Sequence, residues 1–68
     1  MKKIVKIKGM MCEHCEGKVR NELEKIAKVE KVSHDDGEAI IYDVTTKDEE
    51  IKHIIENLGF EVGQITNE

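Results

Sequence analysis

A chain of 68 residues is long enough for one small domain, since such a chain buries only about 60% of its unfolded surface. Any chemistry is therefore expected at the surface and not in a large internal pocket. The composition, 38% hydrophobic and 38% charged with no proline, is typical of an ordered water-soluble domain. We expect a single domain over residues 1–68.

The net charge of −4 is distributed unevenly along the chain. Residues 1–31 carry nine Lys or Arg and five Glu, whereas residues 32–68 carry two Lys and ten Asp or Glu. We interpret this asymmetry as complementary charges within one fold; the alternative is a basic surface that meets an acidic partner. The sequence predicts no nucleic-acid binding, because the net charge is negative and only Tyr42 and Phe60 could stack on a base.

The chain starts with a short apolar run that Lys6 and Lys8 interrupt. This run is too short and too charged for a signal sequence or a membrane span. The sequence therefore predicts no membrane insertion and a cytoplasmic location, where thiols stay reduced and cysteines three apart seldom form a structural disulfide.

The first half of the chain predicts a strand followed by a helix. Residues 3–8 alternate between apolar and charged side chains, as a half-buried strand does, and Gly9 ends the strand. From Glu13 apolar residues recur at helical spacing, at Cys15, Val19, Leu23 and Ile26. Gly17 costs about 1 kcal/mol relative to alanine inside a helix, so we expect it to allow a close approach near the loop.

The second half predicts a hairpin, a helix and a last strand. Strands over residues 29–34 and 38–43 flank Asp35-Asp36-Gly37, and Asp-Gly favours a primed turn. Thr46 and Glu49 fit a capping box before a helix that Gly59 ends, and the last strand covers residues 60–65. The helices are expected to cover the sheet face that carries four residues: Val5, Ile7, Ala39 and Ile41.

The predicted order is β-α-β-β-α-β. This order is that of the ferredoxin-like α+β fold, a four-stranded antiparallel sheet with two helices on one face. Ile4, Ile40 and Tyr42 should then point to the opposite face of the sheet, because neighbouring residues of a strand alternate between its faces.

Both cysteines of the chain lie in one Cys-x-x-Cys motif, Cys12-Glu13-His14-Cys15. At this spacing, two sulfurs can form a metal site, a redox dithiol or half of a four-ligand zinc site. Cys15 should lie in the first helical turn, where the amides favour thiolate, the form that binds metal. Two soft sulfurs at low coordination number suit Cu(I) best, with Ag(I) and Hg(II) as mimics, whereas tetrahedral Zn(II) would need His14, carboxylates or a second protein.

The segment Gly9-Met10-Met11-Cys12-Glu13-His14-Cys15 resembles the Gly-Met-x-Cys-x-x-Cys signature of heavy-metal-associated domains. The resemblance extends over residues 3–66 and includes the element order. It implies that Cys12 and Cys15 bind the metal, that Met10 anchors the loop in the core, and that Phe60 lies near the loop. Within the family, the chain is similar to small bacterial copper chaperones, which pass Cu(I) to metal-binding domains of copper-transporting P-type ATPases.

The histidines and Met11 have simpler interpretations. We expect His14 to face solvent and to modulate the thiolates, with a possible auxiliary ligand role in a dimer, and Met11 to be an exposed loop residue. His34 and His53 lie far along the chain from the cysteines and are expected at the surface.

The resulting hypothesis is a Cu(I) metallochaperone without enzymatic activity, which delivers copper by exchange of thiolate ligands. We expect a monomer without metal and a weak homodimer with Cu(I), since a second copy supplies further sulfur ligands. Two alternatives stay open: a thiol-disulfide oxidoreductase, and a domain for another soft metal (Hg, or Zn and Cd) such as an ATPase regulatory domain. The oxidoreductase is disfavoured because the chain lacks the thioredoxin length and a Cys-Gly-Pro-Cys sequence.

Overall fold

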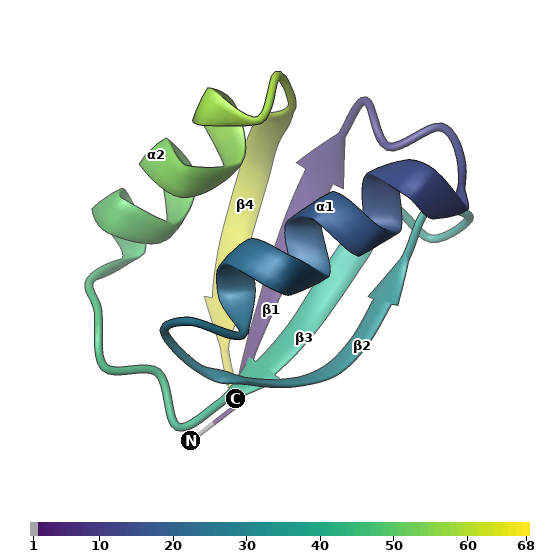
Figure 1. Ribbon diagram of the computed structural model, residues 1–68. Helices are drawn as coiled ribbons and strands as arrows, with labels where there is room; N and C mark the ends of the chain where they lie inside the picture. Colours follow the sequence, from purple (N-terminus) through teal and green to yellow (C-terminus); the bar gives the residue numbers. More distant parts are fainter. Residues whose placement is uncertain (1) are drawn as a thin grey trace.

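The computed structural model describes residues 2–68, which form four strands and two helices in the predicted order (Figure 1). Most of the ends of these elements lie within about two residues of their predicted positions. The elements are β1 (Lys2–Lys8), α1 (Glu13–Leu23), β2 (Lys28–Ser33), β3 (Glu38–Tyr42), α2 (Asp48–Asn57) and β4 (Glu61–Asn67).

The four strands form one antiparallel sheet with the order β2-β3-β1-β4. Both helices lie on the same face of this sheet, α1 over β1 and β3 and α2 beside β4 (Figure 1). The predicted ferredoxin-like α+β fold is confirmed. In this topology the connections β1–α1, β2–β3 and α2–β4 all meet at one end of the sheet, which is where the cysteines lie.

The predicted strand register is confirmed by burial. Val5, Ala39 and Ile41 are fully buried between the sheet and the helices, and Ile7 is only 4% exposed. Ile40, next to Ile41, is half-buried on the open face of the sheet. Because a slip of one residue would turn every side chain over, this pattern leaves a single register for β1 and β3. The helices complete the core with four fully buried residues: Val19, Leu23, Ile51 and Ile55.

Part of the uneven charge distribution is paired within the fold. Four of the five Lys–carboxylate ion pairs between residues 2–68 join a lysine of the first half to an acid of the second half. The exception, Lys25–Glu22, lies within one turn. The four pairs are Lys3–Asp48, Lys6–Glu38, Lys28–Asp43 and Lys31–Asp36.

Two predicted details of the second half were wrong. The predicted capping box does not form, since Lys47 occupies the N-cap of α2 and the buried Thr46 Oγ1 has no hydrogen-bond partner. The β2–β3 hairpin closes at the pair Ser33–Glu38, so its loop has four residues and is not a two-residue primed turn. Only Gly37 of this loop takes a positive φ, +66°.

The interpretation of Gly17 was also wrong. A Cβ atom at this position would have no neighbour within 4 Å, so no close approach within the chain requires a glycine. At Gly37 the situation is reversed. Its φ is positive, and a Cβ there would lie 3.1 Å from the carbonyl oxygen of Ile7, whose N–H donates to the Gly37 carbonyl.

These two glycines predict alanine substitutions of opposite effect. Gly17→Ala should raise the free energy of unfolding by about 1 kcal/mol, because alanine loses less backbone entropy in a helix. Gly37→Ala should lower it by about 1–2 kcal/mol, the cost of a left-handed conformation for a residue with a Cβ. Urea unfolding of both variants beside the wild type measures the difference, and a loss of stability in Gly17→Ala would contradict the packing described here.

Candidate metal centre

Cys12 is the N-cap residue of α1, with an extended backbone (φ −162°, ψ 178°), and Cys15 lies in the first turn. The Cys12 carbonyl accepts hydrogen bonds from the N–H groups of Cys15 and Glu16, which fixes the two cysteines on one turn of backbone. Both are free thiols; Cys12 is exposed and Cys15 is partly buried against the core. One sulfur is thus held by the packing of α1 and the other lies at the surface.

The start of α1 also favours the thiolate form of Cys12. The pKa of the Cys12 thiol lies below its usual value, chiefly because of the backbone N–H of Cys15 and then that of His14. The thiol makes no capping hydrogen bond of normal geometry, so we attribute this effect to the partial positive charge of the amides. The lowered pKa favours the form that binds metal.

Met10 and Phe60 hold the loop that precedes Cys12. Met10 is only 6% exposed and belongs to the core cluster. Gly9 has a φ of +100°, and a Cβ there would lie 3.4 Å from the Phe60 ring. The backbone thus turns tightly between β1 and the buried Met10, with Phe60 from the α2–β4 connection against it.

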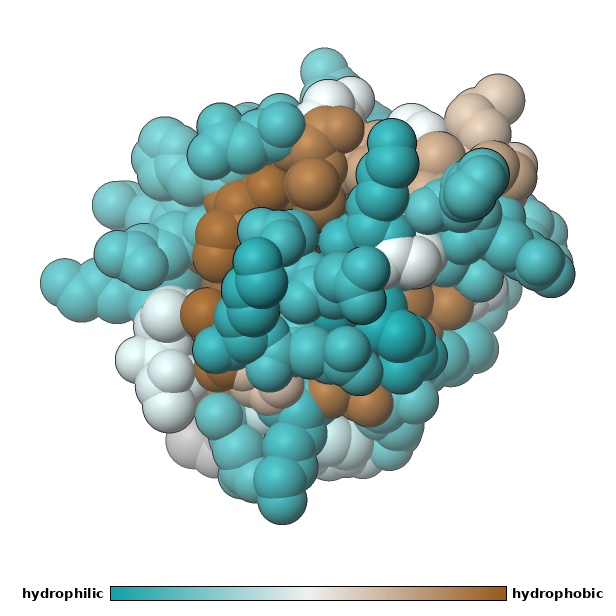
Figure 2. Space-filling view, viewed as in Figure 1, coloured by the Kyte–Doolittle hydropathy of each residue, from teal (hydrophilic) through white to brown (hydrophobic). Residues whose placement is uncertain are grey.

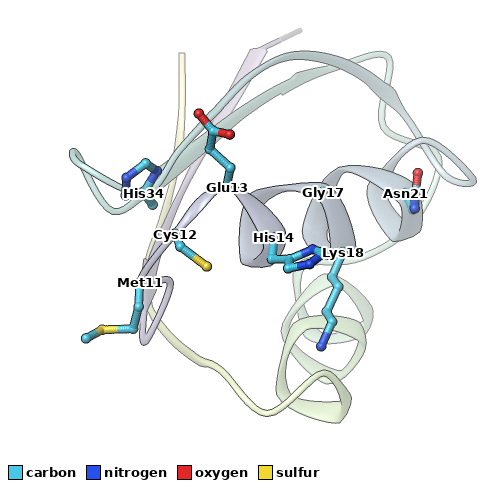
Figure 3. A pocket seen from close by; sticks show the side chains of 8 residues that line it. All are labelled: Met11, Cys12, Glu13, His14, Gly17, Lys18, Asn21 and His34. Carbon is cyan, nitrogen blue, oxygen red and sulfur yellow. The ribbon is translucent and has the colours of Figure 1, made fainter.

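An open hollow lies in front of the exposed thiol (Figure 3). Met11 and His14 are exposed on this hollow, as the sequence predicted, and the Met11 side chain is turned outward in Figure 3. Among residues 2–68, Met11 is the only large hydrophobic residue that is exposed, at 81%. The residues that line the hollow are Met11, Cys12, Glu13, His14, Gly17, Lys18, Asn21 and His34.

His34 is the residue of this site that sequence analysis missed. It is distant from the cysteines in the chain, but the β2–β3 turn carries it to the hollow, on the side of Cys12 (Figure 3). Its backbone N–H and its ring Nδ1 both lie 2.6 Å from Glu16 Oε2, so Glu16 ties the first turn of α1 to this turn. His53, in contrast, is exposed on α2, as predicted.

The donor atoms fit a soft ion better than a hard one. Two thiols are available, and within residues 2–68 no three His, Cys, Asp or Glu side chains are already grouped to hold one ion. This conformation therefore offers too few ligands for ions that need four to six protein ligands. The two thiols are enough for an ion with a low coordination number.

Comparison with known families and structures identifies the domain. The model of the heavy-metal-associated domain matches residues 4–61. The chain belongs to the heavy-metal-associated domain family. No curated protein sequence matches it significantly.

Solved structures with the same fold agree with this assignment. The CopZ metallochaperone is 28% identical with a TM-score of 0.80, and the match covers 93% of this chain and all of CopZ. A copper-binding domain from HMA7, a P-type ATPase, is 32% identical with a TM-score of 0.78, over 98% of this chain and 96% of that domain. The yeast copper transporter domain Ccc2a is 28% identical with a TM-score of 0.75, over 93% and 94% of the two chains.

No helix among the described residues of this heavy-metal-associated domain is long and apolar enough to cross a membrane.

The contact between Glu16 and His34 predicts how stability depends on pH. The pKa of His34 is raised from 6.5, chiefly by the hydrogen bond to Glu16, with the charges of Asp35 and Cys12 adding to it. The pKa of Glu16 is lowered from 4.5, first by the backbone N–H of His34 and then by its ring, with the charge of Arg20 adding to the lowering.

The raised pKa of His34 means that the protonated ring contributes its full stabilisation of the fold below pH 6.5. This contribution is lost as the pH rises through the raised pKa. The Glu16 carboxylate contributes its full stabilisation of the fold above pH 4.5, and this contribution is lost as the pH falls through its lowered pKa.

The stability difference between wild type and His34→Gln should thus be largest between pH 4.5 and 6.5 and shrink on both sides. Urea unfolding across this range measures it, with His53→Gln as the matched control on an exposed helix position. A difference that keeps growing above neutral pH would contradict the assigned contact.

Proposed function

We propose that this domain binds one Cu(I) ion through Cys12 and Cys15 and delivers it to a similar Cys-x-x-Cys domain of a copper-transporting P-type ATPase. The observation that carries the proposal is the pair of free thiols at the exposed start of α1, in a domain of the heavy-metal-associated family. The names of the similar structures point to copper, since they include a metallochaperone, a copper-binding domain from a P-type ATPase and a copper transporter domain.

Ligand chemistry supports Cu(I) among the ions that the family can bind. Two thiolates satisfy Cu(I) at low coordination number, and the same holds for Ag(I) and Hg(II). Zn(II) prefers four nitrogen or sulfur ligands. The position of Met11 next to Cys12 adds a soft thioether to the surroundings, in place of the hard carboxylate that would favour Zn(II).

Transfer requires that a partner thiolate reach the ion before both original ligands have left. Cys12 and the hollow in front of it are open to such an approach. Figure 2 shows hydrophobic atoms at the surface between the two helices, toward the end of the molecule where the β1–α1 connection lies, with smaller hydrophobic areas elsewhere on this face. An apolar area toward the same end of the molecule as an exposed ligand suits brief docking of a partner domain. Docking of a second copy in the same way would form a weak, metal-dependent homodimer.

This role needs binding and ligand exchange and no catalysed reaction, and we propose that it takes place in the cytoplasm. A second candidate is a metal-binding domain that acts as part of an ATPase. The 32% identity to the HMA7 domain favours this candidate as much as the 28% identity to CopZ favours a free chaperone.

Removal of either thiol should abolish tight Cu(I) binding. We expect Cys12→Ser and Cys15→Ser each to weaken Cu(I) affinity by orders of magnitude, because a hydroxyl is a poor ligand for a soft ion. A competition titration of the reduced protein with a Cu(I) chelator measures the affinity, and circular dichroism checks that the fold is kept.

Thr66→Ala, which pairs with Ile4 at the other end of the sheet, serves as the control and should bind as the wild type does. Unchanged Cu(I) affinity in either cysteine variant would refute the assignment of the ligands.

A further inference from the structure

Gly17 is a glycine that the folded chain does not need. It lies inside α1, where glycine is less favourable than alanine, and its φ is not positive. A Cβ atom there would meet nothing within 4 Å. Gly17 is exposed and lines the hollow in front of Cys12. The missing side chain therefore leaves a notch in the outer face of α1 that the chain itself does not fill.

This notch opens away from the core. Glu13, Gly17 and Asn21 are four residues apart, so they share one face of α1, and all three line the hollow. The buried residues of the helix, Val19 and Leu23, lie on the face toward the sheet. The notch can therefore be filled only by another molecule.

Met11 lies on the other side of the exposed thiol. Its side chain is 81% exposed, and Figure 3 shows Cys12 between Met11 and the part of α1 that carries Gly17. Methionine is unbranched and flexible, so it fills irregular gaps. The surface around Cys12 thus has a projecting apolar side chain on one side and an unfilled notch on the other.

A two-fold axis at the exposed thiol exchanges these two features. In a two-fold dimer, a contact of one residue with a second residue of the partner is matched by the reverse contact. A rotation by 180° about Cys12 takes Met11 of one copy to the side on which Gly17 of the other copy lies. The same rotation brings the two Cys12 thiols together, where a shared Cu(I) ion gains sulfur ligands.

The charges of the hollow also suit a second copy. Apart from the thiol and two histidines, the hollow has one acidic and one basic side chain, Glu13 and Lys18. Neither makes an ion pair with another side chain of residues 2–68. Two copies therefore bring equal numbers of opposite, unpaired charges to this surface, and like charges do not dominate the contact.

We propose that the hollow in front of Cys12 is the contact surface for a second copy of this chain, with Met11 of each copy packed at the Gly17 notch of the other. This inference rests on the proposed function, because Cu(I) shared by the thiols holds the two copies together. Glycine at position 17 then serves docking, and the helix stability that it sacrifices is a common consequence of a functional surface.

Sedimentation equilibrium of the reduced, Cu(I)-loaded protein tests this contact. The wild type should be a monomer without copper and a dimer with one Cu(I) per chain. Gly17→Gln fills the notch and should weaken the dimer roughly 10- to 100-fold. Its fold should become more stable, because glutamine is a better helix former than glycine, and its Cu(I) affinity as a monomer should be unchanged. His53→Gln places the same side chain at an exposed position of α2 and should dimerise as the wild type does.

A second substitution tests whether the two features contact each other. Met11→Ala should weaken the dimer about 10-fold. The variant with both substitutions should be no weaker than the weaker single variant, because a filled notch excludes nothing once the methionine side chain is gone.

Three results would overturn the proposal: losses that multiply in the double variant, a Gly17→Gln variant that dimerises as the wild type does, or a wild type that binds Cu(I) and stays monomeric. Each of these results leaves Cu(I) binding intact. Failure of the proposed function would instead appear as a wild type that does not bind Cu(I).

Discussion

The start of α1 is the constraint on which the rest of this structure depends. Met10 is buried in the core, and two residues later the thiol of Cys12 is exposed at the N-cap of the helix. The chain can make this change within two residues because Gly9 takes a φ of +100° and lies against Phe60. The stripe of α1 that continues from Cys15 to the buried Val19 and Leu23 then fixes the helix on the sheet. The position of Cys12 is thus set by the point at which the chain leaves the core.

Much of this arrangement could be predicted because it follows from periodicity. Alternation in β1 and β3 determined which residues face the helices, and the helical spacing of apolar residues located both helices. The Cys-x-x-Cys motif lies where these two periods meet, so its position at the junction of strand and helix was predictable as well. Burial of Met10 followed from the family resemblance and not from its own chemistry, since Met11 is chemically identical and exposed.

The features that sequence analysis missed depend on contacts between distant segments or on loop geometry. His34 lies on the same hollow as Cys12 only because the β2–β3 turn lies at the same end of the sheet as the β1–α1 connection. Its hydrogen bonds to Glu16 join residues that are 18 positions apart, which no local pattern records. The loop that ends at Gly37 has four residues and not the two that were predicted, because Asp-Gly occurs in turns of either length. The Thr46 capping box failed since α2 begins after Lys47, and local propensity leaves a helix start uncertain by one or two residues.

The central claim is that the domain holds Cu(I) between the sulfurs of Cys12 and Cys15, at a surface from which it can be passed on. X-ray absorption at the copper edge of the Cu(I)-loaded monomer examines the ligands of the ion directly. The account predicts a first coordination shell made of sulfur alone, and the same shell in His34→Gln, because Cu(I) does not need the imidazole. A first shell dominated by nitrogen or oxygen would contradict the account.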